Sequence, residues 1–224
     1  MKNSYKGFTL AEVLITLVII GVIAALTVPS LINKTNNEET VSRLKKVYST
    51  LAQTTNLIIA EEGTPRADKG GWANSFDNVF NLYKKHMNKA RECGSNDGCF
   101  EQLDNRGYKS LSGSYRYNNW NADTTEWARK LVLADGTQVV IEYYPTTAND
   151  CNGHWGGSDN FCFQIWADVN GSKKPNQYGR DVFMFAVKEQ GLYPGGCDYD
   201  GECTTTSQGG GCACKVLREG AMNY

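Results

Sequence analysis

The sequence predicts an α+β protein. A long N-terminal α-helix, with a transmembrane half and an amphipathic half, packs on an antiparallel β-sheet head that has a disulfide-rich C-terminal region. Three observations predict this fold. An apolar run near the N-terminus passes into a helical pattern of apolar residues, later segments alternate as strands do, and all eight cysteines follow the apolar run. Helical patterns followed by strand patterns are typical of α+β domains.

The apolar run extends from Phe8 to Val28 and contains one charged residue, Glu12. A helix of this length spans about 30 Å, the thickness of the hydrocarbon core of a bilayer. Lys2 and Lys6 precede the run and favour a cytoplasmic N-terminus. The alternatives are a plain signal anchor and a secretory signal peptide, whose apolar region usually has only about 7–15 residues. A carboxylate in hydrocarbon costs about 2.5–3.5 kcal/mol, so Glu12 needs a functional explanation that a plain anchor lacks.

The residues Gly7-Phe8-Thr9-Leu10, then Glu12 and Pro29, closely resemble the N-terminus of type IV pilin-like proteins, the pilins and the type II secretion pseudopilins. The resemblance covers about the first 30 residues. It implies that a prepilin peptidase removes residues 1–7 by cutting after Gly7 and that the new terminal residue, Phe8, is N-methylated. It also implies that residues 8–29 form the filament core and that Glu12 pairs with the terminal amine of a neighbouring subunit. Each charge of such a buried pair offsets the desolvation cost of the other.

The same resemblance implies partners and a location. The partners are other pilin or pseudopilin subunits, the prepilin peptidase and methyltransferase, and an inner-membrane assembly platform. Before assembly the protein would cross the inner membrane once, with a cytoplasmic N-terminus and a periplasmic head, and it would then enter a periplasmic pseudopilus or a cell-surface pilus. The formal net charge of −1 does not indicate a nucleic-acid surface.

Residues 30–62 continue the helix as an amphipathic segment. Apolar residues spaced three, four or seven positions apart form one stripe: Leu31, Val41, Leu44, Tyr48, Leu51 and Ile58. We expect one helix from Thr9 to Glu61, roughly 80 Å long at about 1.5 Å per residue. Gly63 and Pro65 are strong stop signals that end it.

Residues 63–224 form the expected α+β head. Apolar spacing predicts a second helix from Trp72 to Arg91. Residues 131–144 predict a hairpin with Asp135-Gly136 as a two-residue turn. Further strands are expected over 161–167 and 181–187, which gives a sheet of about four strands, and the region after residue 195 is expected to be loop-like.

An even number of cysteines in an exported domain indicates disulfides. Local spacing favours Cys93 with Cys99 and Cys151 with Cys162. Cys212 and Cys214 are poorly placed to bond each other, so each is expected to pair with one of the remaining two cysteines, Cys197 and Cys203. A zinc site built from the last four cysteines, with His154, is the alternative, although the spacing lacks paired Cys-x-x-Cys units.

The loop from Asp168 to Asp181 could also hold a metal. Asp168 and Asn170, with Asp181 or Asn176 closing the shell, are the kind of oxygen ligands that Ca²⁺ takes. The loop is also similar to a β–β loop that holds calcium in some pseudopilins. The alternative is a turn in which Asp and Asn side chains cap the backbone. The segment lacks the terminal Glu of an EF-hand loop.

The chain carries no enzyme signature, so we expect a non-enzymatic protein. We expect a structural subunit of a type IV filament, either a type II secretion pseudopilin or a minor type IV pilin. A membrane-anchored binding module that does not polymerise, and that binds a glycan, cargo or another surface, is the alternative. Several aromatic residues could stack on a glycan or partner, or else belong to the core: Trp120, Trp127, Trp155, Tyr115 and Tyr117.

Overall fold

The structure is a computed structural model of the chain that describes residues 7–96, 98–100, 107–116, 120, 127–155, 157–199 and 203–224. It divides into two compact units, residues 1–39 and residues 40–224. Lys2 and Lys6 lie outside the described residues, as does Tyr117, and the side chain of Tyr115 is not described.

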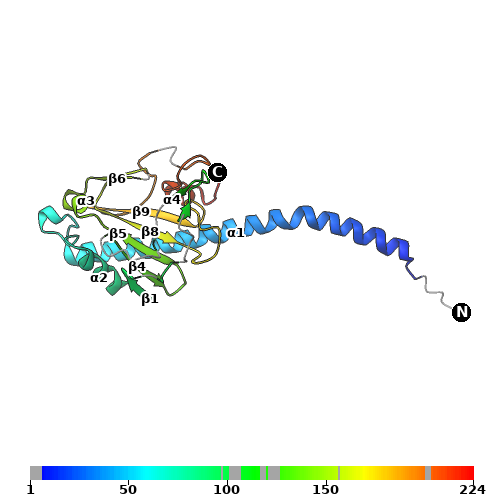
Figure 1. Cartoon of the computed structure of the whole chain (residues 1–224), viewed down its shortest axis with the longest axis horizontal. Coiled ribbons are helices and arrows are strands. Elements are labelled where there is room, and N and C mark those ends of the chain that lie inside the picture. Colours follow the sequence, from blue (N-terminus) through cyan, green and yellow to red (C-terminus); the bar gives the residue numbers. More distant parts are fainter. Residues whose placement is uncertain are drawn as a thin grey trace. The chain divides into compact units, whose positions relative to one another are not determined.

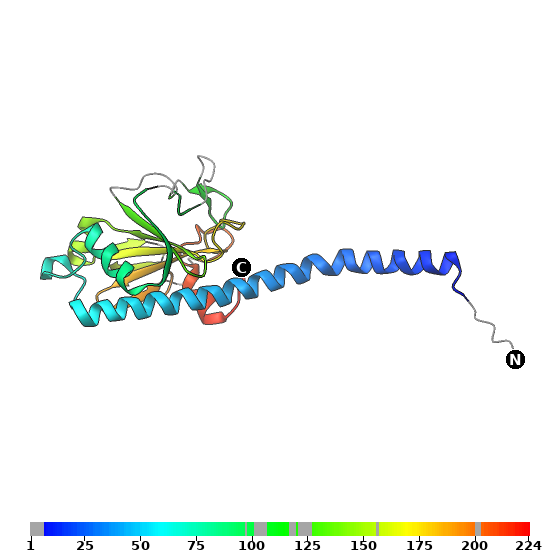
Figure 2. The ribbon, with the colours of Figure 1, turned by 90° about the horizontal axis from the view of Figure 1, so that it is seen from below.

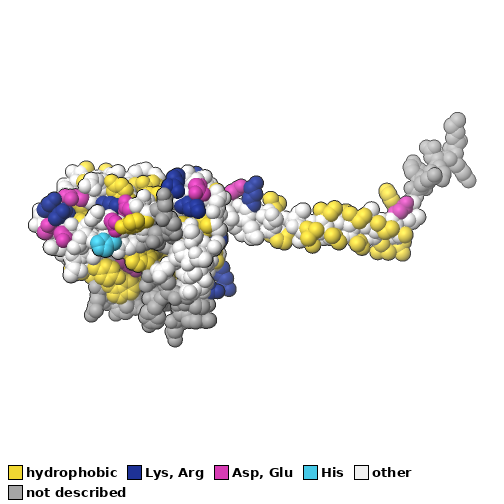
Figure 3. All heavy atoms as spheres, turned by 90° about the horizontal axis from the view of Figure 1, so that it is seen from above, with side chains coloured by type: hydrophobic (Ala, Val, Ile, Leu, Met, Phe, Trp, Pro, Cys, Tyr) yellow, Lys and Arg dark blue, Asp and Glu magenta, His cyan; other side chains and the backbone are white. Residues whose placement is uncertain are grey.

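The first unit contains the start of helix α1 (Leu10–Glu62), which continues through Pro29. Its large apolar side chains are exposed, and they cover this part of the helix in Figure 3. By length and composition α1 can cross a membrane. The expected single helix is therefore present.

The second unit is built on a six-stranded sheet in the order β1-β4-β5-β8-β9-β10, in which all neighbours are antiparallel (Figure 1). The strands are β1 (Lys89–Gly94), β4 (Ala128–Leu133), β5 (Gln138–Glu142), β8 (Phe163–Asp168), β9 (Val182–Lys188) and β10 (Gly191–Pro194). Two short ribbons pair β2 (Tyr108–Lys109) with β3 (Tyr115–Arg116), and β6 (Gly153–Trp155) with β7 (Ser158–Phe161). The remaining helices are η1 (Ala67–Lys69), α2 (Phe76–His86), α3 (Pro145–Asp150) and α4 (Cys212–Glu219).

One face of the sheet is covered by α2 and the part of α1 that belongs to the second unit (Figure 2). Leu44, Leu51 and Ile58 of α1 are fully buried in this core. Tyr48 stacks on Phe185 of β9 with ring centroids 6.0 Å apart. The apolar side chains of the helices recur at helical spacing, and they pack on apolar side chains that alternate along the strands. This core is therefore the one that the apolar spacing in the sequence predicts.

The opposite face carries a second core of aromatic residues. Trp120 contacts Tyr108, Trp166 and Tyr178 with ring centroids 5.0 to 5.9 Å apart. Trp120 is therefore a core residue, whereas Trp127 and Trp155 are partly buried at the edge of this cluster. Strands β5, β8 and β9 are consequently buried on both faces.

The predicted hairpin of β4 and β5 is confirmed, but its turn differs from the expected two-residue turn. The Leu133 N–H donates to Thr137 O at 2.8 Å, and the Gly136 N–H donates to Leu133 O at 3.0 Å. Among Ala134, Asp135 and Gly136, only the glycine has a positive φ, 88°. The turn is thus the three-residue kind that ends in a left-handed glycine.

Three other expectations need correction. The second helix is shorter than Trp72–Arg91, because Ser75 caps α2 through the Asn78 N–H and the chain enters an edge strand at Lys89. The sheet has six strands rather than about four, because the short edge strands β1 and β10 carry little apolar alternation. Leu31 is 65% exposed and does not belong to the buried stripe, which begins at Val41.

All eight cysteines form disulfides: Cys93–Cys99, Cys151–Cys162, Cys197–Cys214 and Cys203–Cys212. The zinc alternative is wrong, because it needs free thiolates. The region after residue 195 is not only loop, since Cys212 and Cys214 lie in the first turn of α4. The backbone at Gly196 packs closely against Gly211, the residue before α4. A Cβ at position 196 would lie 1.9 Å from Gly211 O, so only glycine fits there.

Because Leu44 is buried and Leu31 is exposed, we expect alanine substitutions at these two positions of α1 to differ clearly in their effect on stability. Leu44→Ala should lower the free energy of unfolding of the second unit by about 2–5 kcal/mol, because it leaves a cavity. Leu31→Ala, a matched exposed change in the same helix, should alter it by less than about 0.5 kcal/mol. Urea titration followed by tryptophan fluorescence measures both, since all five tryptophans lie in the second unit. Equal losses in the two variants would contradict the packing described above.

Candidate functional site

The bond between Gly7 and Phe8 lies just outside α1. Residues 7–9 have no regular secondary structure, and α1 begins at Leu10. Phe8 is 89% exposed, and among the described residues none beyond its chain neighbours lies within 4 Å of a Cβ built on Gly7. The described side of this bond is therefore accessible.

Glu12 and Thr9 form a capping box at the start of α1. The Glu12 carboxylate accepts the Thr9 N–H at 2.8 Å and the Thr9 hydroxyl at 2.7 Å, while the Glu12 N–H donates to Thr9 Oγ1 at 3.3 Å. Glu12 is the third helical residue, the position from which a Glu reaches back to the N-cap. The Thr9-x-x-Glu12 spacing was available in the sequence as a signal for this cap. Glu12 thus has a local structural role that the sequence analysis missed.

The Asp168–Asp181 loop is closed by hydrogen bonds to buried carboxylates. Asp181 accepts the N–H groups of Asn176 at 2.8 Å and Gln177 at 2.7 Å, and its Oδ2 also accepts the Asn170 amide at 3.2 Å. Asp168 Oδ1 accepts the Asn170 N–H at 3.2 Å. The three residues expected to hold calcium are therefore neighbours, and the hydrogen bonds described favour the turn interpretation. The calcium interpretation stays a prediction.

Burial changes the acidity of this loop. Asp181 is fully buried, and this desolvation raises its pKa to about 6, although hydrogen bonds from Gln177, Asn176 and Asn170 act in the opposite direction. The free-energy cost of desolvating the charged carboxylate is larger than the stabilisation that these hydrogen bonds provide.

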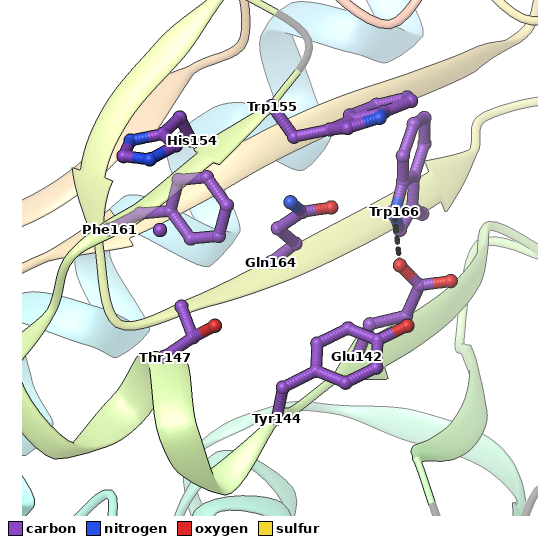
Figure 4. Close-up of a pocket in the computed structure, with 9 residues that line it drawn as sticks. Glu142, Tyr144, Thr147, His154, Trp155, Phe161, Gln164 and Trp166 are labelled. Carbon is purple, nitrogen blue, oxygen red and sulfur yellow. Dashed lines mark hydrogen bonds between the residues drawn. The ribbon is translucent and has the colours of Figure 1, made fainter.

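A pocket of about 280 Å³ opens on the side of the sheet that carries the aromatic core (Figure 4). Strands β5 and β8, helix α3 and the β6–β7 ribbon supply its lining. The lining residues are Glu142, Tyr144, Thr147, Gly153, His154, Trp155, Phe161, Gln164 and Trp166. Of these, Trp155 was singled out in the sequence as a possible stacking residue and His154 only as a possible zinc ligand.

Glu142 is a buried carboxylate held by two indoles. Its Oε1 accepts the Trp120 N–H and its Oε2 accepts the Trp166 N–H, both at 2.8 Å. Tyr144 lies nearby, and partial burial together with the charge of Glu142 raises the pKa of Tyr144 to about 12. Glu142 of β5 lies directly opposite Gln164 of β8 in the sheet, so two polar side chains from separate strands meet at this site.

The raised pKa of Asp181 predicts a pH dependence of stability. The usual pKa of an Asp is about 3.9, so the folded state binds this proton more tightly than the unfolded chain does. The contribution of Asp181 to the unfolding free energy is therefore largest below about pH 4, falls as the pH rises to about 6 and is level above that. Asp181→Asn should remove this slope, so its stability relative to the wild type should rise across the window by on the order of 1–3 kcal/mol. Urea titrations at several pH values measure this, and Asp77→Asn, at an exposed carboxylate, should keep the wild-type slope.

The turn interpretation predicts that calcium does not stabilise the head. Because Asp181 already accepts three N–H donors, the melting temperature should be the same in excess calcium and in chelator. Differential scanning fluorimetry gives this comparison directly. A melting temperature that rises with calcium in the wild type, and not in Asp181→Asn, would instead establish the metal site.

Comparisons with known proteins agree with the N-terminal site. Searches of the curated proteins and of the solved structures gave no match to this chain. A scan against protein families matched residues 2–28 to the prokaryotic N-terminal methylation motif. This match spans Gly7, Phe8 and Glu12. The chain carries the type IV pilin-like signature at its N-terminus.

Proposed function

We propose that the protein is a structural subunit of a type IV filament, either a secretion pseudopilus or a surface pilus. It is processed after Gly7, methylated at Phe8 and assembled through the N-terminal part of α1. The methylation motif at residues 2–28 is the observation that carries this proposal. The exposed apolar side chains of α1 and the position of Glu12, which lie within these matched residues, support the same proposal.

The apolar surface of the first unit needs an apolar environment. Large side chains are exposed along its helix, from Leu10 at 78% to Ile32 at 52%. An apolar surface of this extent indicates a membrane or a partner. Lipid surrounds this helix before assembly, and the equivalent helices of neighbouring subunits surround it in the filament.

Glu12 is placed to contact the new N-terminus. Cleavage after Gly7 creates an amine on Phe8, the residue before Thr9, whose N–H already donates to the Glu12 carboxylate. In an apolar environment an unpaired carboxylate and an unpaired amine are both costly. Pairing Glu12 with the amine of the adjacent subunit removes both costs and sets the register of one helix against the next.

The location and the partners follow from this proposal. The subunit waits in the inner membrane with its N-terminus in the cytoplasm, where prepilin peptidase acts, and the assembly platform then extracts it. The head lies in the periplasm or outside the cell, where its four disulfides are stable.

A non-polymerising, membrane-anchored binding module is the second candidate. The pocket between β8 and the β6–β7 ribbon favours it, because a purely structural subunit has no need of a lined cavity. The two candidates differ in what they require of Glu12. Only the filament needs its charge.

Glu12→Gln separates the charge of this residue from its capping role. A glutamine at this helical position still caps the helix, but it cannot pair with an amine as an anion. The variant should therefore insert in the membrane and form few or no filaments. Filaments sheared from cells or observed by microscopy provide the measurement, and Glu38→Gln, at an exposed position of the same helix, should assemble normally.

Intact-mass analysis should first show that both variants have lost residues 1–7 and gained one methyl group. Normal filaments from Glu12→Gln would overturn the proposed charge pair. A mature chain that begins within or after the apolar run would overturn the proposed processing.

A further inference from the structure

The pocket lined by β5, β8, α3 and the β6–β7 ribbon has no part in filament assembly as proposed above. Its polar groups, however, are arranged as in a ligand site. Glu142 is already engaged, since each of its oxygens accepts an indole N–H. Its fixed carboxylate therefore holds Trp166 in place at the base of the pocket.

Gln164 is the polar group that remains. It is only 7% exposed, its side chain points into the pocket in Figure 4, and its amide has no hydrogen bond to any residue in the described part of the chain. Because the amide faces the open pocket rather than a protein partner, its hydrogen-bonding groups are available to a molecule that enters. The amide has both donors and an acceptor, and it therefore fits a ligand that offers both.

Aromatic rings form the walls around this amide. Trp155 meets Trp166 edge to face, with centroids 5.1 Å apart and an angle of 63°. Tyr144, which is 45% exposed, lies on the other side of the amide, and Phe161 lines the pocket beside His154 (Figure 4). The faces of such rings carry partial negative charge and attract the weakly positive hydrogens of C–H groups.

We propose that this pocket binds one neutral sugar residue of a glycan. A sugar ring presents C–H groups on its faces, which suit the aromatic walls, and hydroxyl groups at its edge, which both donate to and accept from the Gln164 amide. A quaternary ammonium group would also suit aromatic rings, but it leaves the amide unpaired. The volume of about 280 Å³ lies at the small end of ligand sites, which take about 300–1,000 Å³, and so it suits a single ring.

The test uses the full-length chain in a polyoxyethylene detergent, because a detergent with a sugar headgroup would compete. The probes are the methyl glycosides of glucose, galactose, mannose and N-acetylglucosamine, with tetramethylammonium as the rival ligand. Saturation-transfer NMR detects contact, and the change in tryptophan fluorescence gives the affinity. At least one glycoside should bind saturably, with a Kd in the millimolar range.

Two variants and one control locate the site. Gln164→Met keeps the size of the side chain and should weaken binding about tenfold, through the lost hydrogen bonds. Trp155→Ala should abolish detectable binding, while Tyr193→Ala, at an exposed tyrosine outside the pocket, should leave the Kd unchanged. Melting temperatures near that of the wild type show that each variant is folded.

Three results would overturn the proposal. The first is that none of the glycosides binds saturably. The second is that both pocket variants still bind a glycoside as the wild type does, and the third is that only tetramethylammonium binds. The test does not involve filament assembly, so its failure and the failure of the filament proposal can be told apart.

Discussion

The three central strands of the head, β5, β8 and β9, are buried on both faces, and the rest of the second unit is arranged to meet this requirement. The helices α1 and α2 cover one face with side chains at regular helical spacing. Trp120, Tyr108 and the short ribbons cover the other face in its described part. The segments that cover this second face have little regular secondary structure, and contacts between aromatic rings and disulfides hold them in place. The pocket lies where these segments meet α3.

Glu12 has one role that the structure describes and one that we propose. Its charge would be costly in a membrane, and this cost is the reason for proposing a cationic partner on another chain. Its hydrogen bonds with Thr9 meet a different need, since the first N–H groups of any helix lack partners within that helix. The cap acts within one chain, whereas the proposed charge pair would act between two chains. The same carboxylate could therefore serve both before and after the proposed assembly.

The parts of the fold that follow a strong local period were predictable. The long helix and the β4–β5 hairpin have clear apolar spacing and turn residues. The edge strands β1 and β10 were missed because β1 has no buried residue and β10 has only four residues, so neither shows a clear alternation of apolar and polar residues. Helix α4 was missed because its surroundings are rich in glycine and cysteine. The pocket could not be predicted, because Glu142 and Gln164 come from separate strands and only the pairing of β5 with β8 brings them together. In contrast, Gly7, Phe8 and Glu12 lie within one short segment, so the motif that they belong to can be recognised in the sequence alone.

The disulfide between Cys151 and Cys162 has a consequence for when the pocket exists. Cys151 follows α3, and Cys162 lies between β7 and β8, so Gly153, Trp155 and Phe161 all belong to the loop that this bond closes. On the export route proposed above, both cysteines would be thiols while the chain is in the reducing cytoplasm, and this wall of the pocket would have no covalent closure. Oxidation after export would then complete the wall, so the proposed pocket would become available to a ligand only outside the cytoplasm.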